Sequence, residues 1–229
     1  MLDCVPMSGR MSDYRIFFEQ FVRNTHSTGA ISPSSRWLAG ALCRYVGQCQ
    51  RPQRILEVGP GTGAVTRSIV KILGPDDHLD LVELNDSFVK ALRRRFQDDA
   101  AFRRVAARSQ VIHRRVEELP DSQSYDLIIS GLPFNNFAVS DVKRILDAYA
   151  RLLKPGGTLS FFEYIAVRPG RSLVSSPLER ERLRDVGGHL RQILDSHSVR
   201  RDCVVSNLPP AWVHHLRFSE ADRGLVSAL

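Results

Sequence analysis

The heptapeptide EVGPGTG, residues 57–63, follows a short apolar run, RILEV at 54–58, and precedes a segment that predicts a helix. Glycine adopts backbone conformations that other residues avoid, so such a turn can bend sharply and approach a ligand closely. A second apolar run, HLDLV at 78–82, ends at Glu83, 20 residues after Gly63. A carboxylate at that place can accept the ribose hydroxyls of a nucleoside. The pattern therefore predicts a nucleoside-binding α/β domain.

Two cofactor classes fit the glycine turn. Gly59, Gly61 and Ala64 satisfy the G-x-G-x-x-G/A pattern of dinucleotide-binding proteins. Three features typical of class I methyltransferases favour S-adenosylmethionine: Glu57 precedes the glycines, KPGG at 154–157 precedes a predicted strand, and the sheet is expected to end antiparallel. A third interpretation is a tight strand-to-helix turn without a cofactor. We predict S-adenosylmethionine as the cofactor, with these residues binding it: Glu57, Gly59, Gly61, Gly63, Glu83, Leu84, Val116, Ser130 and Gly131.

Alternating strands and helices predict an α/β fold, a doubly wound, seven-stranded Rossmann-like sheet with antiparallel last strands. Asp86 is expected to cap the helix after the second strand. We expect residues 1–50 to form an N-terminal extension that contains an amphipathic helix, and residues 51–229 to form a methyltransferase domain. The expected strands are 54–58, 78–82, 110–113, 125–130, 158–164, 199–206 and 211–218, and the expected helices 34–45, 64–73, 86–96, 139–153 and 179–194.

The stretch after the third strand departs from the common methyltransferase pattern. Many methyltransferases carry an acidic residue there, which accepts from the adenine amine, whereas this chain has Arg114 and Arg115. Arginine has no acceptor, so adenine is expected to be held by backbone groups at Val116, with the Glu117 side chain as the weaker alternative.

The segment SGLPFNNF at 130–137 follows the fourth strand, where the acceptor lies in class I methyltransferases. Adenine amino-methyltransferases carry Asn or Asp at the place of Gly131, which weakens the case for a nucleobase acceptor. Together with the segments below, this stretch resembles bacterial phospholipid N-methyltransferases, which convert phosphatidylethanolamine towards phosphatidylcholine. The other matching segments are FFEQF at 17–21, GAISPSSRWLA at 29–39, EVGPGTGAVT at 57–66 and NLPPAWV at 207–213.

The resemblance implies an enzyme that docks on a membrane through an N-terminal helix, and the composition agrees. The chain has a net charge of +7 and a pI of about 9.6, which favours an anionic partner. An apolar helical face flanked by arginines could lie in a lipid interface, or it could cover the sheet or the cofactor. Its membrane-binding residues are expected to be Tyr14, Arg15, Phe17, Phe18, Phe21 and Arg23, with Val22 on the same face.

The expected partners are an anionic membrane surface and an amino-phospholipid. Nucleic acid is disfavoured because the basic run around Arg93–Arg95 lacks interleaved aromatic residues. The expected location is the cytoplasm, peripherally on the inner face of the cell membrane, because no signal peptide, membrane span or C-x-x-C pair is present. No metal site is expected.

N-methylation requires a lipid ammonium that has lost its proton, and a low-dielectric pocket disfavours the cation. Tyr164, at the end of the fifth strand, and Phe134 are expected to line this pocket as the catalytic residues. Three alternatives stay open: another amino lipid such as ornithine lipid, an RNA adenine dimethylase, and an S-adenosylmethionine-binding protein without turnover.

Overall fold

The structure, a computed structural model, describes residues 36–122, 124–134, 137–165, 177–207 and 209–219. The predicted N-terminal membrane helix lies outside these ranges. In chain order the described elements are α2 (Arg36–Leu42), β1 (Arg54–Val58), α3 (Thr66–Ile72), β2 (His78–Glu83), α4 (Asp86–Asp98), α5 (Ala100–Arg103), η1 (Ala106–Arg108), β3 (Ser109–His113), η2 (Val116–Glu118), β4 (Tyr125–Ser130), α6 (Val139–Leu152), β5 (Leu153–Tyr164), α8 (Pro177–His197), β6 (Ser198–Val204) and β7 (Ala211–Arg217).

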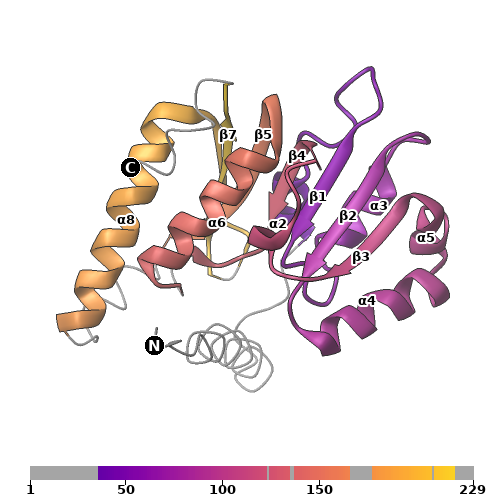
Figure 1. The fold of residues 1–229 in the computed structure, drawn as a ribbon, viewed down its shortest axis with the longest axis horizontal. Coiled ribbons are helices and arrows are strands. Elements are labelled where there is room, and N and C mark those ends of the chain that lie inside the picture. Colours follow the sequence, from indigo (N-terminus) through magenta and orange to yellow (C-terminus); the bar gives the residue numbers. More distant parts are fainter. Residues whose placement is uncertain (1–35, 123, 135–136, 166–176, 208, 220–229) are drawn as a thin grey trace, which may run out of the picture.

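The strands form one sheet of seven in the order β3-β2-β1-β4-β5-β7-β6, which runs across Figure 1. Strands β1 to β5 are parallel, whereas β7 is antiparallel to both of its neighbours. This confirms the predicted fold with its antiparallel ending. The chain moves outward from β1 in one direction and from β4 in the other, so the carboxyl ends of these two strands flank the crevice where such sheets bind ligands.

Both faces of the sheet are covered by helices, which explains why its central strands are continuous apolar runs. Every residue of β4 is buried. One apolar layer joins α6 and α8 to the sheet, and the other joins α2, α3 and α5 to it. Along β5, Leu159 and Phe161 belong to the first layer, and Phe162 and Tyr164 border the second. Because side chains alternate between faces, Glu163 points towards α8.

The structure corrects two local predictions. Asn85, not Asp86, caps α4: it has an extended backbone, and its side chain accepts from the N–H groups of Ser87 and Phe88. Asp86 instead pairs with Lys90 at 2.7 Å. Strand β5 begins at Leu153 and not at residue 158, because Leu153 already pairs with Tyr125 before an irregularity in the register. None of the described helices is long and apolar enough to cross a membrane.

Candidate active site

The three glycines of the EVGPGTG turn all have positive φ angles, of 69°, 55° and 81° for Gly59, Gly61 and Gly63. A Cβ atom at Gly59 would lie 2.5 Å from Leu132 Cδ2, and one at Gly63 would lie 3.1 Å from Leu92 Cδ2. A Cβ atom at Gly61 would meet nothing within 4 Å. All three positions favour glycine by their backbone conformation, and a side chain at Gly59 or Gly63 would also displace a leucine, whereas Gly61 leaves the space above the turn open for a ligand.

Glu83 ends β2 beside this turn and is 1% exposed. Its Oε1 accepts from the N–H groups of Leu84 and Asn85, both at 2.8 Å, and its Oε2 accepts from Gly61 N–H at 3.0 Å. Burial raises the pKa of Glu83, while these three N–H groups favour its ionised form. A carboxylate has about four acceptor positions, so one remains on Oε2, where we propose that it accepts a ribose hydroxyl.

Glu57 lies in β1 directly before the turn and is also 1% exposed. Neither of its carboxyl oxygens accepts a hydrogen bond from any residue that the structure describes. Burial raises the pKa of Glu57 to about 8, although the neighbouring Thr66 favours the ionised form. A buried carboxyl without a donor carries a large desolvation cost. The cost would fall if a bound ligand donated a hydrogen bond to Glu57, and we propose that the amino group of the cofactor is this donor.

A cavity of about 330 Å³, open to solvent, lies beside Glu83 at the carboxyl ends of β1 and β2. Its apolar walls include Val116, which is buried, and Leu132. Arg115 pairs with Glu117 at 3.0 Å, so the carboxylate that was the weaker candidate for the adenine amine already faces a guanidinium. The apolar part of this lining suits an adenine ring, and the full lining is Val58, Gly59, Val82, Glu83, Leu84, Arg114, Arg115, Val116, Glu117 and Leu132.

The turn after β4 packs against the glycine turn. Gly131 N–H donates to Val58 O at 2.8 Å, and a Cβ atom at Gly131 would lie 2.6 Å from Gly59 O. The Ser130 hydroxyl is buried and accepts from Tyr149 Oη at 2.9 Å. At these two positions, only backbone atoms are therefore placed to face a cofactor.

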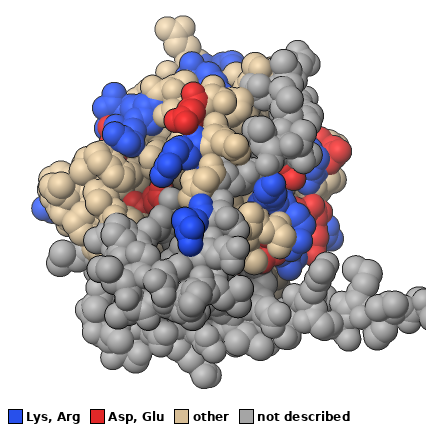
Figure 2. Space-filling view, turned by 90° about the vertical axis from the view of Figure 1, so that its left-hand side faces the viewer, with Lys and Arg blue, Asp and Glu red and all other residues tan. Residues whose placement is uncertain are grey.

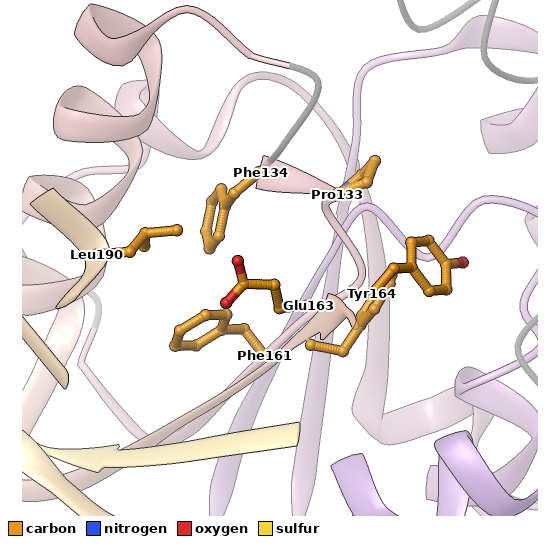
Figure 3. Close-up of a pocket in the computed structure, with 7 residues that line it drawn as sticks. Pro133, Phe134, Phe161, Glu163, Tyr164 and Leu190 are labelled. Carbon is orange, nitrogen blue, oxygen red and sulfur yellow. The ribbon is translucent and has the colours of Figure 1, made fainter. Parts of the chain in front are cut away.

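A second, small cavity lies at the carboxyl end of β5 (Figure 3). Phe134 and Phe161 form its aromatic walls, with ring centroids 5.4 Å apart in an edge-to-face arrangement. The Glu163 carboxylate lies on the same side of β5 as the Phe161 ring and is drawn beside both rings in Figure 3. The lining consists of Pro133, Phe134, Phe161, Phe162, Glu163, Tyr164 and Leu190. Glu163 is the one carboxylate among these residues, and none of them is Lys or Arg.

The two predicted catalytic residues both line this cavity, but from different directions. Phe134 is 2% exposed and is largely a core residue. Tyr164 packs against Phe162 at 5.1 Å on the α2 side, and its hydroxyl points away from Glu163 in Figure 3. Burial raises the pKa of Tyr164 to about 12, so its hydroxyl stays protonated at neutral pH.

The sequence did not single out Glu163. Its side chain is 16% exposed, and its Oε2 lies 3.7 Å from Nε2 of the buried His214. His214 in turn stacks on Phe161 with 5.2 Å between ring centroids. The signal that could have found Glu163 is a lone acid between aromatic residues, FFEY, at the end of a predicted parallel strand. Among the described residues, no cluster of His, Cys, Asp and Glu is arranged to hold a metal ion.

Comparisons with known proteins point to one class of enzyme. Residues 55–157 match the family model described as "Methyltransferase domain". An ornithine lipid N-methyltransferase of Singulisphaera acidiphila is 26% identical over 150 residues, which cover 66% of this chain and 77% of that protein. A ubiquinone/menaquinone biosynthesis C-methyltransferase of Ectopseudomonas mendocina is 32% identical over 123 residues, 53% of this chain and 45% of that protein. The chain thus aligns with less than half of this second relative.

Solved structures share the fold at low sequence identity. A 1,6-didemethyltoxoflavin-N1-methyltransferase of Burkholderia thailandensis, with bound S-adenosylhomocysteine, has a TM-score of 0.65 at 14% identity and covers 95% of this chain and 94% of its own. The N-methyltransferase NodS of Bradyrhizobium japonicum, also with S-adenosylhomocysteine, has a TM-score of 0.60 at 16% identity, covering 82% of this chain and 89% of its own. Residues 55–157 thus match a methyltransferase domain, and the chain has the class I methyltransferase fold, which supports S-adenosylmethionine as its cofactor.

Proposed function

We propose that this enzyme transfers a methyl group to the amine of a lipid head group, phosphatidylethanolamine and its methylated forms or a related amino lipid such as ornithine lipid. The observation that carries the proposal is the cavity at the end of β5, which one carboxylate and aromatic rings line together. A primary amine fits it because a carboxylate attracts its ammonium form. Aromatic faces attract the methylated cations that accumulate as methyl groups are added. The ornithine lipid relative supports the lipid amine class.

S-adenosylmethionine supplies a methyl group on sulfonium sulfur, and its C–S bond breaks, leaving the electron pair on sulfur, as the new N–C bond forms. The lone pair of the acceptor must first be released by loss of a proton. The apolar walls around Phe134 and Phe161 favour the neutral amine because burial disfavours the cation. We propose that Glu163 accepts hydrogen bonds from the amine and receives that proton, and that it orients the lone pair.

The structure also argues against a nucleobase acceptor. Adenine amino-methyltransferases would need a polar side chain where this chain has Gly131. Any side chain there would meet the backbone oxygen of Gly59, because a Cβ atom would lie 2.6 Å from it. A polar residue therefore cannot be accommodated unless the two turns separate. The acceptor function must come from another residue, and Glu163 is the acid in the cavity.

The test offers three acceptors to the enzyme with methyl-labelled cofactor. These are vesicles containing phosphatidylethanolamine, vesicles containing ornithine lipid, and bare RNA, with amine-free vesicles as the blank. The proposal expects label in one or both amino lipids and none in RNA. Labelled RNA with unlabelled lipids would replace it with the nucleic-acid alternative.

A further inference from the structure

The cavity at the end of β5 adjoins a larger groove that the methyl-transfer chemistry does not use. This groove, of about 440 Å³ and open to solvent, lies between α8, β6 and β7. Glu163 and Leu190 line both spaces, so the two are adjacent. The residues lining the groove are Glu163, Gly187, Leu190, Arg191, Leu194, Asp195, Ser198, Arg201, Trp212 and His214.

Strand register determines which side chains share this face of the sheet. Phe161 pairs with His214, and His214 pairs with Arg201, so these three form one row across β5, β7 and β6. Glu163 pairs with Trp212 in the next row of the same face. Neighbouring strands lie about 4.8 Å apart and the two rows about 6.8 Å, so the backbones of Glu163 and Arg201 are separated by about 12 Å. An arginine side chain can reach across much of that distance.

Arg201 is held in position within the groove. Its guanidinium carbon lies 4.2 Å from the centroid of the Trp212 ring. Such a contact restricts a long side chain that would otherwise lose much conformational entropy on binding. A stacked guanidinium also keeps its edge available for a phosphate or carboxylate, which it can bind through two N–H groups.

The other charged groups of the groove change its local charge but leave Arg201 as a cation there. Arg191 lies on α8, and Asp195 follows it by four residues, where the two are neighbours on a helix. Asp195 therefore offsets part of the Arg191 charge. Glu163 lies at the end of the groove that adjoins the acceptor cavity. Figure 2, which views the side of the molecule that carries α8, shows basic side chains with acidic ones among them on this face.

We propose that the groove is the subsite for the anionic part of a zwitterionic head group, with Arg201 as its principal ligand. The phosphate of phosphatidylethanolamine, or the carboxylate of an amino-acid lipid, binds Arg201 while the amine lies at Glu163. This inference rests on the proposed function. It adds the residue by which the enzyme would distinguish a zwitterionic head group from a simple amine. Arg201 binds substrate and takes no part in proton transfer.

The matched control is Arg200, which lies next to Arg201 on the same strand. Arg200 pairs with Asp202 at 2.9 Å, and its backbone is opposite His215, so its side chain faces the other side of the sheet. Arg201→Gln should raise KM for short-chain phosphatidylethanolamine, used below its micelle concentration, about tenfold, equivalent to about 1.4 kcal/mol. Its kcat should stay within about twofold, and Arg201→Lys should recover part of the loss. Arg200→Gln should leave both parameters unchanged.

A binding measurement separates this inference from the proposed function. The chain has two tryptophans, so Trp37→Phe leaves Trp212 as the fluorescent reporter inside the groove. With S-adenosylhomocysteine present, short-chain phosphatidylethanolamine should change this fluorescence. Ethanolamine and inorganic phosphate, each offered alone, should do so at much higher concentration. Arg201→Gln should weaken the lipid response, and Arg200→Gln should not.

Each outcome decides one of the two claims. Methylated lipid with equal kinetics for the Arg201 and Arg200 variants overturns the groove inference and leaves the proposed function standing. A Trp212 response that depends on Arg201, without methylated lipid, supports the groove and overturns the proposed function. If inorganic phosphate alone titrates Trp212 as well as the lipid does, the groove is a general anion site and the inference is wrong.

Discussion

At the residue scale, substitutions at Gly61 can distinguish the cost of backbone strain from the loss of a contact with the cofactor. Gly156 offers the matched control, because both glycines have positive φ, of 55° and 74°, and a Cβ atom at either would meet nothing within 4 Å. Gly61→Ala and Gly156→Ala should each cost about 1–2 kcal/mol of stability, from the left-handed backbone. Only Gly61→Ala should also weaken S-adenosylhomocysteine binding, by about tenfold, if its methyl group crowds the cofactor. Calorimetric titration of both variants with S-adenosylhomocysteine measures the difference. Equal affinities would mean that the cofactor does not lie against Gly61.

Glu57 yields a prediction about pH. Its pKa rises from 4.5 in an unfolded chain to about 8 in the fold, with burial as the main cause. Between those values the native state holds a proton that the unfolded chain has lost, so stability falls as pH rises from about 4.5 to 8. Glutamine cannot titrate, so Glu57→Gln should gain stability relative to the parent as pH increases through this window. Urea unfolding of both proteins without cofactor, at pH 5 and pH 8, measures the difference. A pH-independent difference would mean that Glu57 is not held protonated.

At the element scale, the carboxyl end of β5 has Glu163, the proposed base, on its α8 side and Tyr164 on its α2 side. The Tyr164 hydroxyl points away from Glu163 and stays protonated, with a pKa of about 12. Because a general base contributes about 10²–10⁴-fold, Tyr164→Phe should lower kcat by less than about tenfold and keep the pH profile. Glu163→Gln should lower kcat by about 100-fold or more. A hundredfold loss of kcat in Tyr164→Phe would mean that the Tyr164 hydroxyl takes part in catalysis.

The elements show where prediction from sequence succeeds. The strands at 54–58 and 125–130 were predicted with their observed bounds, because strands covered on both faces are continuous apolar runs between polar turns. The four-residue helix α5 was missed, since it is too short to show a helical period. The sequence predicted that Phe134 and Tyr164 share one pocket, and both line the cavity at the end of β5. It could not find Glu163 or the groove of Arg201, since these depend on residues that β5, β7, β6 and α8 bring together.

At the scale of the whole molecule, several of the positively charged arginines make contacts within the fold. Arg104 donates to Val70 O at 2.6 Å, at the carboxyl end of α3, and Arg67 pairs with Asp99 at 2.7 Å. Arg95 lies over the Phe102 ring at 5.9 Å. Several residues in and beside the basic run therefore stabilise helices, which lowers its share in any membrane contact. The N-terminal segment becomes the principal candidate for docking.

That segment lies outside the described residues, so its prediction rests on sequence. Each large apolar side chain contributes roughly 1.5–3 kcal/mol on full burial, less at a wet interface. Phe17→Asp with Phe21→Asp should abolish sedimentation with anionic vesicles and spare S-adenosylhomocysteine binding. Ile72→Asp, at an exposed apolar residue of α3, is the control and should sediment like the parent. Loss of cofactor binding in the double variant would instead make this helix a cover of the active site.

We propose that the methyl group is joined to the nitrogen of a lipid head group, and one NMR experiment tests this. The enzyme is supplied with ¹³C-methyl cofactor and vesicles of ¹⁵N-labelled phosphatidylethanolamine, and the recovered lipid is examined by NMR. We expect a one-bond coupling between ¹³C and ¹⁵N in this lipid, about 100-fold weaker at equal reaction time when Glu163→Gln replaces the parent enzyme. A ¹³C methyl group bound to carbon or oxygen, or ¹⁵N lipid recovered without label from an enzyme that labels RNA, would contradict this proposal.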